Sequence, residues 1–306
     1  MRFSLAALLT LTPLVAAAAE PVVSLSETPG AIEVTIGDKP FATYIRRGFK
    51  KPFFIDLRAP DGTIVTRSLE EDAVTDHPHH KGLWIGVDEV NEHKHWKEDQ
   101  IVVCRRVEVR TKQDGDPQEP AEFRVGNEWQ DADGKPLLRE TTTYRIFPDR
   151  LIAADIHLTA VGDEPVEFAD TKEGFFAIRV RDELREKGGS GKIVNANGQT
   201  GEKEAWGQTA PWVDYSGTVD GKPVGVAIFD HPDNIRPGRY HVRAYGLFAV
   251  SPFGESAYTN GKNDAKPVHL KPGETLRLRY AAFLHTGDAE SAGIAGRYKR
   301  YVEDLK

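Results

Sequence analysis

The sequence predicts an all-β protein, a large antiparallel β-sandwich with a helix near its C-terminal end. Many short runs alternate apolar and polar residues, glycine and proline recur between these runs, and a helical repeat occurs only near the C-terminus. Alternation with a period of two indicates half-buried strands, and glycine and proline mark the turns between them. Strands this numerous usually split into two packed layers, so a sandwich is expected rather than one open sheet.

The predicted strands follow one another along the chain. The first places Ile32, Val34 and Ile36 on one face and ends at a turn. Hairpin and tight turns are predicted at Asp61-Gly62 and Pro148-Asp149. The other predicted strands cover residues 41–45, 53–57, 63–66, 101–109, 122–129, 138–147, 151–161, 166–169, 175–180, 224–229, 241–250 and 276–284.

The C-terminal helix is predicted to begin at Asp288, a good N-cap, and to end near Leu305. Ile294, Tyr298 and Tyr301 fall on one face at helical spacing together with Leu305, so this face should pack against a sheet. The chain has no repeat of fixed period and no composition break, and residues 20–306 are therefore interpreted as a single domain.

Residues 1–19 are typical of a secretory signal peptide. Arg2 supplies a positive start, residues 5–16 form an apolar run, and small residues at 17–19 form a cleavage site before Glu20. The alternative is a membrane anchor, for which the run is short. The sequence thus predicts a bacterial periplasmic or secreted protein without a further membrane span. A lone cysteine, Cys104, permits no internal disulfide and fits a buried strand position.

The net charge of −7 and the lack of a long basic stretch argue against nucleic acid and anionic membrane surfaces as partners. A more informative feature is a segment of 24 residues, from Asp76 to Asp99, that holds five of the ten histidines. These histidines are His77, His79, His80, His93 and His95, and Asp88 lies among them. Imidazoles and carboxylates together suit acid–base chemistry, metal ligation or binding of a polar substrate.

Three interpretations of the histidine segment stay open: a metal-free polar site, a divalent metal site and a solvated loop. In an extended chain His79 and His80 would point to opposite faces, whereas His77 and His79 could share one. His93 and His95 could also share a face, but the spacing matches no common zinc signature.

Three further segments combine polar and aromatic residues. Glu173 precedes an apolar strand and could act as a base or a hydroxyl acceptor, or simply be an edge charge beside Lys172. In residues 241–250, His241, Arg243 and Tyr245 would lie on one strand face, as a saccharide or carboxylate site requires, or else form an outward polar face. Candidates from neighbouring segments are His231, Asn234, Trp212, Asp214 and Tyr215.

Two interpretations of Trp212 and Tyr215, which lie near Asp214, are equally open. Aromatic rings beside carboxylates can stack on the apolar faces of a sugar while the carboxylates bind hydroxyls. They are equally common as buried anchors between loops.

These segments together resemble a bacterial family labelled "methane oxygenase PmoA". The resemblance covers nearly all of the chain after residue 19 and is carried by the motifs DHPHHKGLW (76–84), Asn91, DTKEG (170–174), WVDYSG (212–217), DHPDN (230–234), HVRAYG (241–246) and SPFG (251–254). It implies a copper- or iron-dependent oxygenase with ligands from His77, His79, His80, His93 or His95. A fainter resemblance, to the galactose-mutarotase-like supersandwich, implies a sugar held in a concave sheet between a histidine acid and a carboxylate base.

We therefore expect an exported supersandwich protein, without a firmly required cofactor, that binds and transforms a small saccharide or glycan fragment. His80 or His241 is the expected general acid and Glu173 the expected general base. The expected substrate-binding residues are His77, His79, Asp88, Asn91, Trp212, Asp214, Tyr215, His231, Asn234, Arg243 and Tyr245. The alternatives are the metal-dependent oxygenase and a non-catalytic glycan-binding protein.

Overall fold

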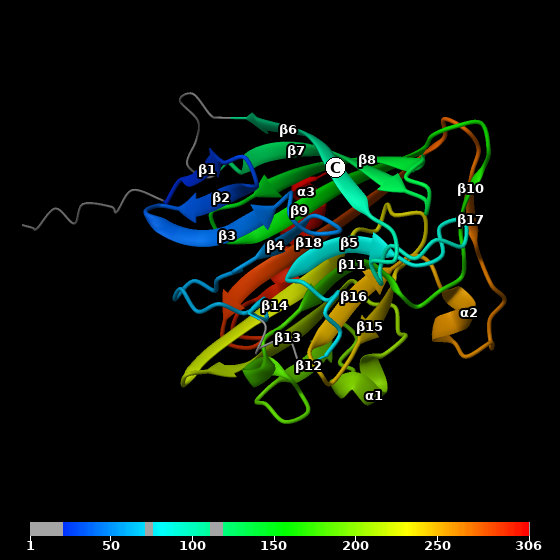
Figure 1. Cartoon of the computed structure of the whole chain (residues 1–306). Coiled ribbons are helices and arrows are strands. Elements are labelled where there is room, and N and C mark those ends of the chain that lie inside the picture. Colours follow the sequence, from blue (N-terminus) through cyan, green and yellow to red (C-terminus); the bar gives the residue numbers. More distant parts are fainter. Residues whose placement is uncertain (1–20, 71–75, 111–118, 306) are drawn as a thin grey trace, which may run out of the picture.

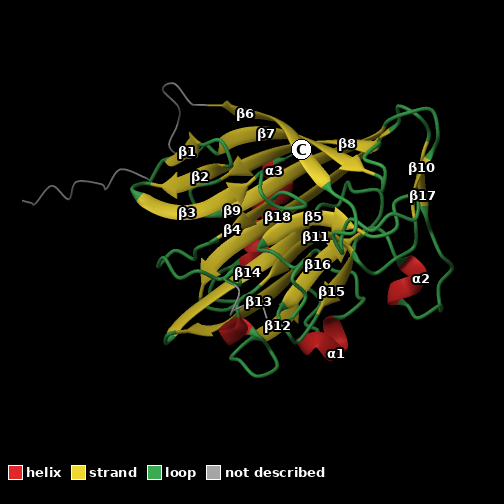
Figure 2. Ribbon diagram, viewed as in Figure 1, coloured by secondary structure: helices red, strands yellow, loops and turns green. Residues whose placement is uncertain are grey.

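The computed structural model describes residues 21–70, 76–110 and 119–305, so the predicted signal peptide lies outside the described residues. In these three ranges no helix has the length and apolarity needed to cross a membrane. Figure 1 shows the chain as two large β-sheets with short helices at the periphery, and Figure 2 shows how strongly strands predominate. The predicted all-β fold class is confirmed.

Each large sheet has eight antiparallel strands. The first sheet has the order β1-β2-β3-β4-β5-β11-β16-β15. Its strands are β1 (Val23–Glu27), β2 (Ala31–Ile36), β3 (Lys39–Ile45), β4 (Phe53–Ile55), β5 (Leu83–Val87), β11 (Gly174–Arg179), β16 (Leu247–Ser251) and β15 (Arg239–Val242).

The second sheet has the order β12-β13-β14-β18-β9-β8-β7-β6. Its strands are β12 (Lys192–Asn195), β13 (Trp212–Val219), β14 (Lys222–Asp230), β18 (Thr275–Thr286), β9 (Leu151–Ala160), β8 (Pro136–Ile146), β7 (Ala121–Gln130) and β6 (Val102–Arg110). The remaining elements are a two-stranded sheet of β10 (Val166–Phe168) and β17 (Val268–Leu270), the 3-10 helix η2 (Asp182–Leu184), and the helices α1 (Gly201–Ala205), α2 (Glu255–Tyr258) and α3 (Ile294–Asp304).

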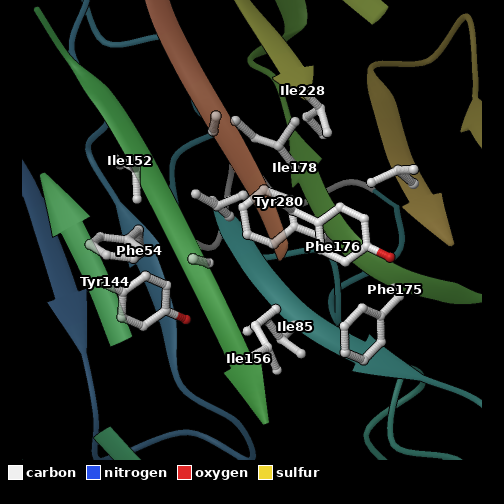
Figure 3. Packing of buried hydrophobic residues seen from close by; sticks show 14 of the residues in the cluster. Phe54, Ile85, Tyr144, Ile152, Ile156, Phe175, Phe176, Ile178, Ile228 and Tyr280 are labelled. Atoms are coloured by element: carbon white, nitrogen blue, oxygen red, sulfur yellow. The ribbon is translucent and has the colours of Figure 1, made fainter. Parts of the chain in front are cut away.

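The core lies between the two sheets. Figure 3 shows side chains of the first sheet beside those of the second: Phe54 beside Tyr144, Ile85 beside Ile156 and Phe176 beside Tyr280. The Phe176 ring stacks on the Tyr280 ring, with centroids 5.6 Å apart and planes at 16°. Every second residue of a strand enters this layer because successive side chains point to opposite faces. The core therefore takes up the inner face of each sheet, and the outer face can make other contacts.

Helix α3 covers part of the outer face of the second sheet. Ile294 and Tyr301 are buried there, and Tyr298 and Leu305 pack beside them, as the helical spacing predicts. The predicted start is wrong, however. Gly293 has a left-handed φ of 63° and is the N-cap, whereas Asp288 accepts from Ser291 N (2.9 Å) in a separate turn. Glycine tolerates this backbone conformation, which interrupts the helical pattern.

Candidate functional site

A turn that follows Asp76 is held by two buried arginines. Arg67, 3% exposed, donates from Nη1 to the backbone oxygen and Oδ1 of Asp76, at 2.9 and 2.7 Å. Its Nη2 donates to the backbone oxygens of His77 and His80, both at 2.9 Å. Arg179, fully buried in β11, donates from Nη2 to the same Oδ1 at 2.7 Å. One carboxylate and two guanidinium groups thus fix the start of the histidine segment.

Three rings lie parallel over this turn. His77 stacks on His80, with centroids 4.8 Å apart and planes at 6°, and on Tyr245, at 5.0 Å and 7°. His80 also stacks on Trp84 of β5 at 5.4 Å. His79 contacts His80 edge-on at 4.4 Å. The expectation that His79 and His80 point apart is wrong because the chain is turned here, with His80 N donating to His77 O at 2.9 Å.

His80 is a neutral hydrogen-bond donor in this arrangement. Burial, together with the nearby His79, lowers the pKa of His80 far below its usual value. Arg179 Nη1 lies 3.4 Å from His80 Nδ1, and a guanidinium can only donate, so Nδ1 accepts and the ring proton sits on Nε2. Among the described residues Nε2 has no hydrogen-bond partner and can donate to a ligand.

Two acidic residues, Asp88 and Glu173, lie opposite each other in the backbone where β5 and β11 meet. Val87 pairs with Gly174, and Asp88 N donates to Glu173 O at 2.9 Å, so the ladder continues to these two residues. Burial raises the pKa of Asp88 to about 6, and the Glu173 charge contributes. Burial alone would also raise the pKa of Glu173, but the Lys172 ammonium, which forms a short ion pair with it, and His241 lower the pKa overall.

His241 lies beside Glu173 and contacts the backbone of Lys172. Its Nδ1 lies 3.1 Å from Lys172 O and 4.0 Å from Glu173 Oε2. Its Nε2 accepts from Arg243 Nε at 3.0 Å, so the proton sits on Nδ1. Burial lowers the pKa of His241 to about 4. A neutral imidazole with both nitrogens occupied positions its neighbours rather than donating a proton to a substrate.

The predicted strand over residues 241–250 is wrong. The chain turns between β15 and β16, with Arg243 N donating to Leu247 O (2.7 Å) and Gly246 N to Arg243 O (2.9 Å). Gly246 has a φ of 95°, which glycine adopts readily. The turn, rather than a shared strand face, carries Arg243 to Glu202 (Nη1 to Oε1, 2.9 Å) and Tyr245 to the histidine rings.

Tyr245 connects the two halves of the site. The Arg179 guanidinium lies 4.8 Å from its ring centroid. Burial raises the pKa of Tyr245 to about 12, while Arg243 and Arg179 oppose and Glu173 and Asp76 add to this shift. Charges from both halves thus act on one phenol. The histidine turn precedes β5, and the Glu173–His241 group lies at β11 and β15; in the first sheet β5, β11, β16 and β15 are neighbours, side by side in Figure 1, so the two groups are taken together as the candidate site.

The metal interpretation finds no ligand set in the described residues, where no three His, Cys, Asp or Glu side chains are placed to hold a metal ion. His77 and His80 stack face to face, so their nitrogen lone pairs lie in parallel planes and do not converge. His95 is buried beside Trp129 with Nε2 2.9 Å from Gln130 O. His93 N and O both pair with the backbone of Val90. The residues do not fit the copper or iron implied by the oxygenase resemblance.

Several predicted binding residues lie elsewhere. Asn91 fastens a loop, its Oδ1 accepting from Glu167 N at 2.7 Å. Trp212 packs on the α3 side of the second sheet. Tyr215 is fully buried, and its hydroxyl accepts from Glu186 N at 2.8 Å. Asp214, His231 and Asn234 also belong to the second sheet and its loops.

Sequence reasoning missed the charged residues that support the site. Arg67, Arg179, Lys172 and Glu202 were not candidates for binding or catalysis. Lys51, which is also buried, donates to His79 O at 2.8 Å and to Trp96 O at 3.3 Å. One signal was available: Arg179 is the single charge in an otherwise apolar run over residues 174–180. A charge at such a position implies a buried partner.

Asp214 forms a buried pair with His285 of β18 on the outer face of the second sheet, with Oδ1 and Nε2 2.7 Å apart. Burial opposes the imidazolium, but the Asp214 charge and hydrogen bond outweigh it and raise the pKa of His285. The pair therefore stabilises the fold fully below the unfolded histidine pKa of about 6.5. This stabilisation is lost as the pH rises through the raised folded pKa.

We expect the stability advantage of the wild type over His285→Gln to shrink as the pH rises above about 6.5, because the imidazolium loses its proton. Urea unfolding of both proteins at a series of pH values gives the difference in the free energy of unfolding. The control is His157→Gln, since the His157 side chain is 42% exposed and lies 3.8 Å from Asp155. A difference for His285→Gln that does not change with pH would contradict the assignment.

A sequence model described as "Family of unknown function (DUF6807)" matches residues 31–299. This match does not support the predicted membership of the family labelled methane oxygenase PmoA. A search of the curated proteins gives no match.

Solved structures similar to this chain include the GH36 α-galactosidase AgaA from Geobacillus stearothermophilus, with 9% identity and a TM-score of 0.49. The alignment covers 88% of this chain and 41% of the α-galactosidase, so the chain spans about two fifths of that protein. Another is galactose 1-epimerase from Lactobacillus acidophilus, with 10% identity, a TM-score of 0.41 and coverage of 87% and 99%. At these values the comparisons concern the fold alone.

Proposed function

We propose a function for this chain, which belongs to the family described as DUF6807: it binds a small saccharide or glycan fragment at the described site and acts on it by acid–base chemistry. The observation that carries the proposal is the Asp88–Glu173 pair. The two carboxylates are adjacent across β5 and β11, yet their pKa values move in opposite directions. Environments that separate the pKa values of two neighbouring carboxyl groups suit one as acid and the other as base.

Glu173 is assigned as the base, because the Lys172 ammonium keeps it ionised and its side chain is 20% exposed. It removes a proton from a carbon or hydroxyl of the sugar. Asp88, with a pKa of about 6, is protonated often enough near neutral pH to return a proton. His80 and His241, the acids expected from the sequence, are neutral and are assigned to binding and positioning instead.

The surrounding groups match a saccharide. His80 Nε2 and the Arg243 guanidinium supply donors for hydroxyl oxygens. The parallel His77 and Tyr245 rings supply flat faces on which the apolar side of a pyranose can stack. His79, half-buried at the edge of the rings, lies beside this surface.

The test is a screen of neutral and acidic oligosaccharides with chromatographic detection of products. We expect Glu173→Gln to lower kcat by at least roughly 100-fold, because a positioned base contributes about that much, while the saccharide Kd changes little. For the wild type, kcat/KM should fall as the pH rises above about 6, since Asp88 must be protonated to act as the acid.

The matched control is Glu167→Gln, a half-exposed glutamate of β10 whose carboxylate lies 3.5 Å from His269. It should retain wild-type turnover. Unchanged turnover in Glu173→Gln would rule out the proposed base. Saccharide affinity without any product in the wild type would instead favour the non-catalytic glycan-binding alternative.

A further inference from the structure

The outer face of β6, β7 and β8 contains a cavity of about 450 Å³. It lies on the second sheet, whereas the candidate site lies on the outer face of the first. Its lining is unusual for a chain of net charge −7, because four arginines and only two glutamates surround it. These residues are Arg105, Arg106, Arg124, Arg139, Glu108 and Glu128.

A β-bulge concentrates this charge. The register between β6 and β7 shifts between Cys104 and Arg106, so Arg105 is an extra residue in β6. The side chains of Arg105 and Arg106 are consequently both exposed, by 56% and 76%, although they are consecutive in a strand. Bulges re-aim side chains in this way, and they often lie beside binding sites.

Two of the four arginines form no ion pair with any described residue. Arg105 pairs with Glu128 at 2.7 Å and Arg106 with Glu108 at 2.5 Å. Arg124 donates only to the Thr143 hydroxyl, at 3.4 Å, and Arg139 forms neither a hydrogen bond nor an ion pair with any described residue. The cavity therefore has an excess of about two positive charges and two guanidinium groups available to a ligand.

Gly126 leaves open space in the middle of the cavity floor. It pairs with Arg106 on one side and Thr141 on the other, in the middle of β7. Its φ is not positive, and an added Cβ would meet only Arg106 Cβ within 4 Å, at an ordinary 3.5 Å. The fold thus does not require glycine here. Glycine even weakens the interior of a strand, so its presence at this position has no structural benefit. Glycine in such a position often marks the close approach of a ligand.

We propose that this cavity is a second binding site, for a small acidic saccharide whose carboxylate is held by Arg124 and Arg139. A guanidinium matches a carboxylate with two parallel hydrogen bonds. The volume falls in the range of small-molecule sites, about 300 to 1,000 Å³. Pro136 and Val161 add apolar surface to the lining, against which the ring of a sugar can pack.

Titration calorimetry with D-glucuronate tests the site, with D-glucose as the neutral counterpart and acetate as the bare carboxylate. We expect D-glucuronate to bind more tightly than either, and its affinity to fall as salt is added. Arg139→Gln and Arg124→Gln should each weaken D-glucuronate binding roughly tenfold, the usual loss for a charged hydrogen bond. Gly126→Val should abolish binding with stability equal to or above the wild type, because it fills the floor and suits a strand.

The control is Arg110→Gln, which removes the same charge from β6 outside the cavity. It should leave D-glucuronate affinity within about twofold, since a distant exposed charge is largely screened. No binding of D-glucuronate, equal affinity for D-glucose or acetate, or unchanged affinity in Gly126→Val would overturn the proposal. Glu173→Gln leaves this cavity intact, so the outcome is independent of the function proposed for the other sheet.

Discussion

Gly82→Ala is expected to lower the free energy of unfolding by more than about 3 kcal/mol, or to prevent folding altogether. Gly82 joins the histidine turn to β5 and has a φ of 53°. A Cβ there would lie 1.8 Å from Phe54 O and 2.9 Å from Phe54 C, both backbone atoms of β4. Neither strand can yield easily, because Leu83 pairs with Phe54 and Gly82 O accepts from Arg179 N at 2.8 Å.

Two costs therefore add in this variant. A non-glycine residue in the left-handed region costs about 1–2 kcal/mol, and the clash must in addition separate β4 from the start of β5. The separation would move His80 away from Trp84 and Arg179, so saccharide binding should weaken together with stability. Urea unfolding followed by tryptophan fluorescence measures the first effect, and calorimetry the second.

Gly162→Ala isolates the conformational cost. Gly162 has a φ of 92°, and nothing lies within 4 Å of an added Cβ. This control should lose only about 1–2 kcal/mol. If Gly82→Ala unfolded at the same urea concentration as Gly162→Ala, the close approach of β4 and the histidine turn would not be the constraint described.

Strand β9 was predicted well because its alternation marks the face that enters the core between the sheets. In β9, Ile152, Ala154, Ile156 and Leu158 are buried as the alternation indicates, and Pro148-Asp149 lies in the predicted turn. β5 was missed for the opposite reason. All five of its residues are buried, so no alternation exists to detect.

The candidate site was only partly predictable. His80 lies beside Tyr245, and Glu173 lies beside His241, and the unusual local composition of the sequence identified all four. What the sequence could not supply is the protonation state, because the neutral state of His241 depends on its burial and on the nearby Arg243 guanidinium. The turn between β15 and β16 was hidden as well, since the alternation continues through residues 241–245 and only Gly246 marks it.

Arg67→Met should destabilise the protein by about 3–5 kcal/mol, the usual cost of removing one partner from a buried ion pair. The guanidinium is 3% exposed and serves four acceptors within one turn: Asp76 O, Asp76 Oδ1, His77 O and His80 O. The variant leaves three backbone carbonyls of the histidine turn without this donor. Unpaired buried polar groups cost about 1–3 kcal/mol each, so the loss extends beyond the ion pair.

Arg67→Lys separates charge from geometry. Lysine keeps the positive charge, but one ammonium cannot reach all the acceptors that the two Nη atoms of Arg67 reach. Most of the loss in the free energy of unfolding should therefore persist. The control is Arg277→Lys. Arg277 also binds a carboxylate through two nitrogens, Asp155 at 2.9 and 2.8 Å, but its side chain is 51% exposed. Exposed pairs contribute at most about 1 kcal/mol.

The functional consequence distinguishes a positioning role from a purely stabilising one. Arg67 is buried beneath the turn, yet it fixes the backbone on which His77 and His80 stand. Below the unfolding midpoint, folded Arg67→Lys should therefore bind saccharide more weakly than wild type, while folded Arg277→Lys should not. If Arg67→Lys were both stable and fully competent to bind, the charge of Arg67 rather than its fork of hydrogen bonds would hold the turn.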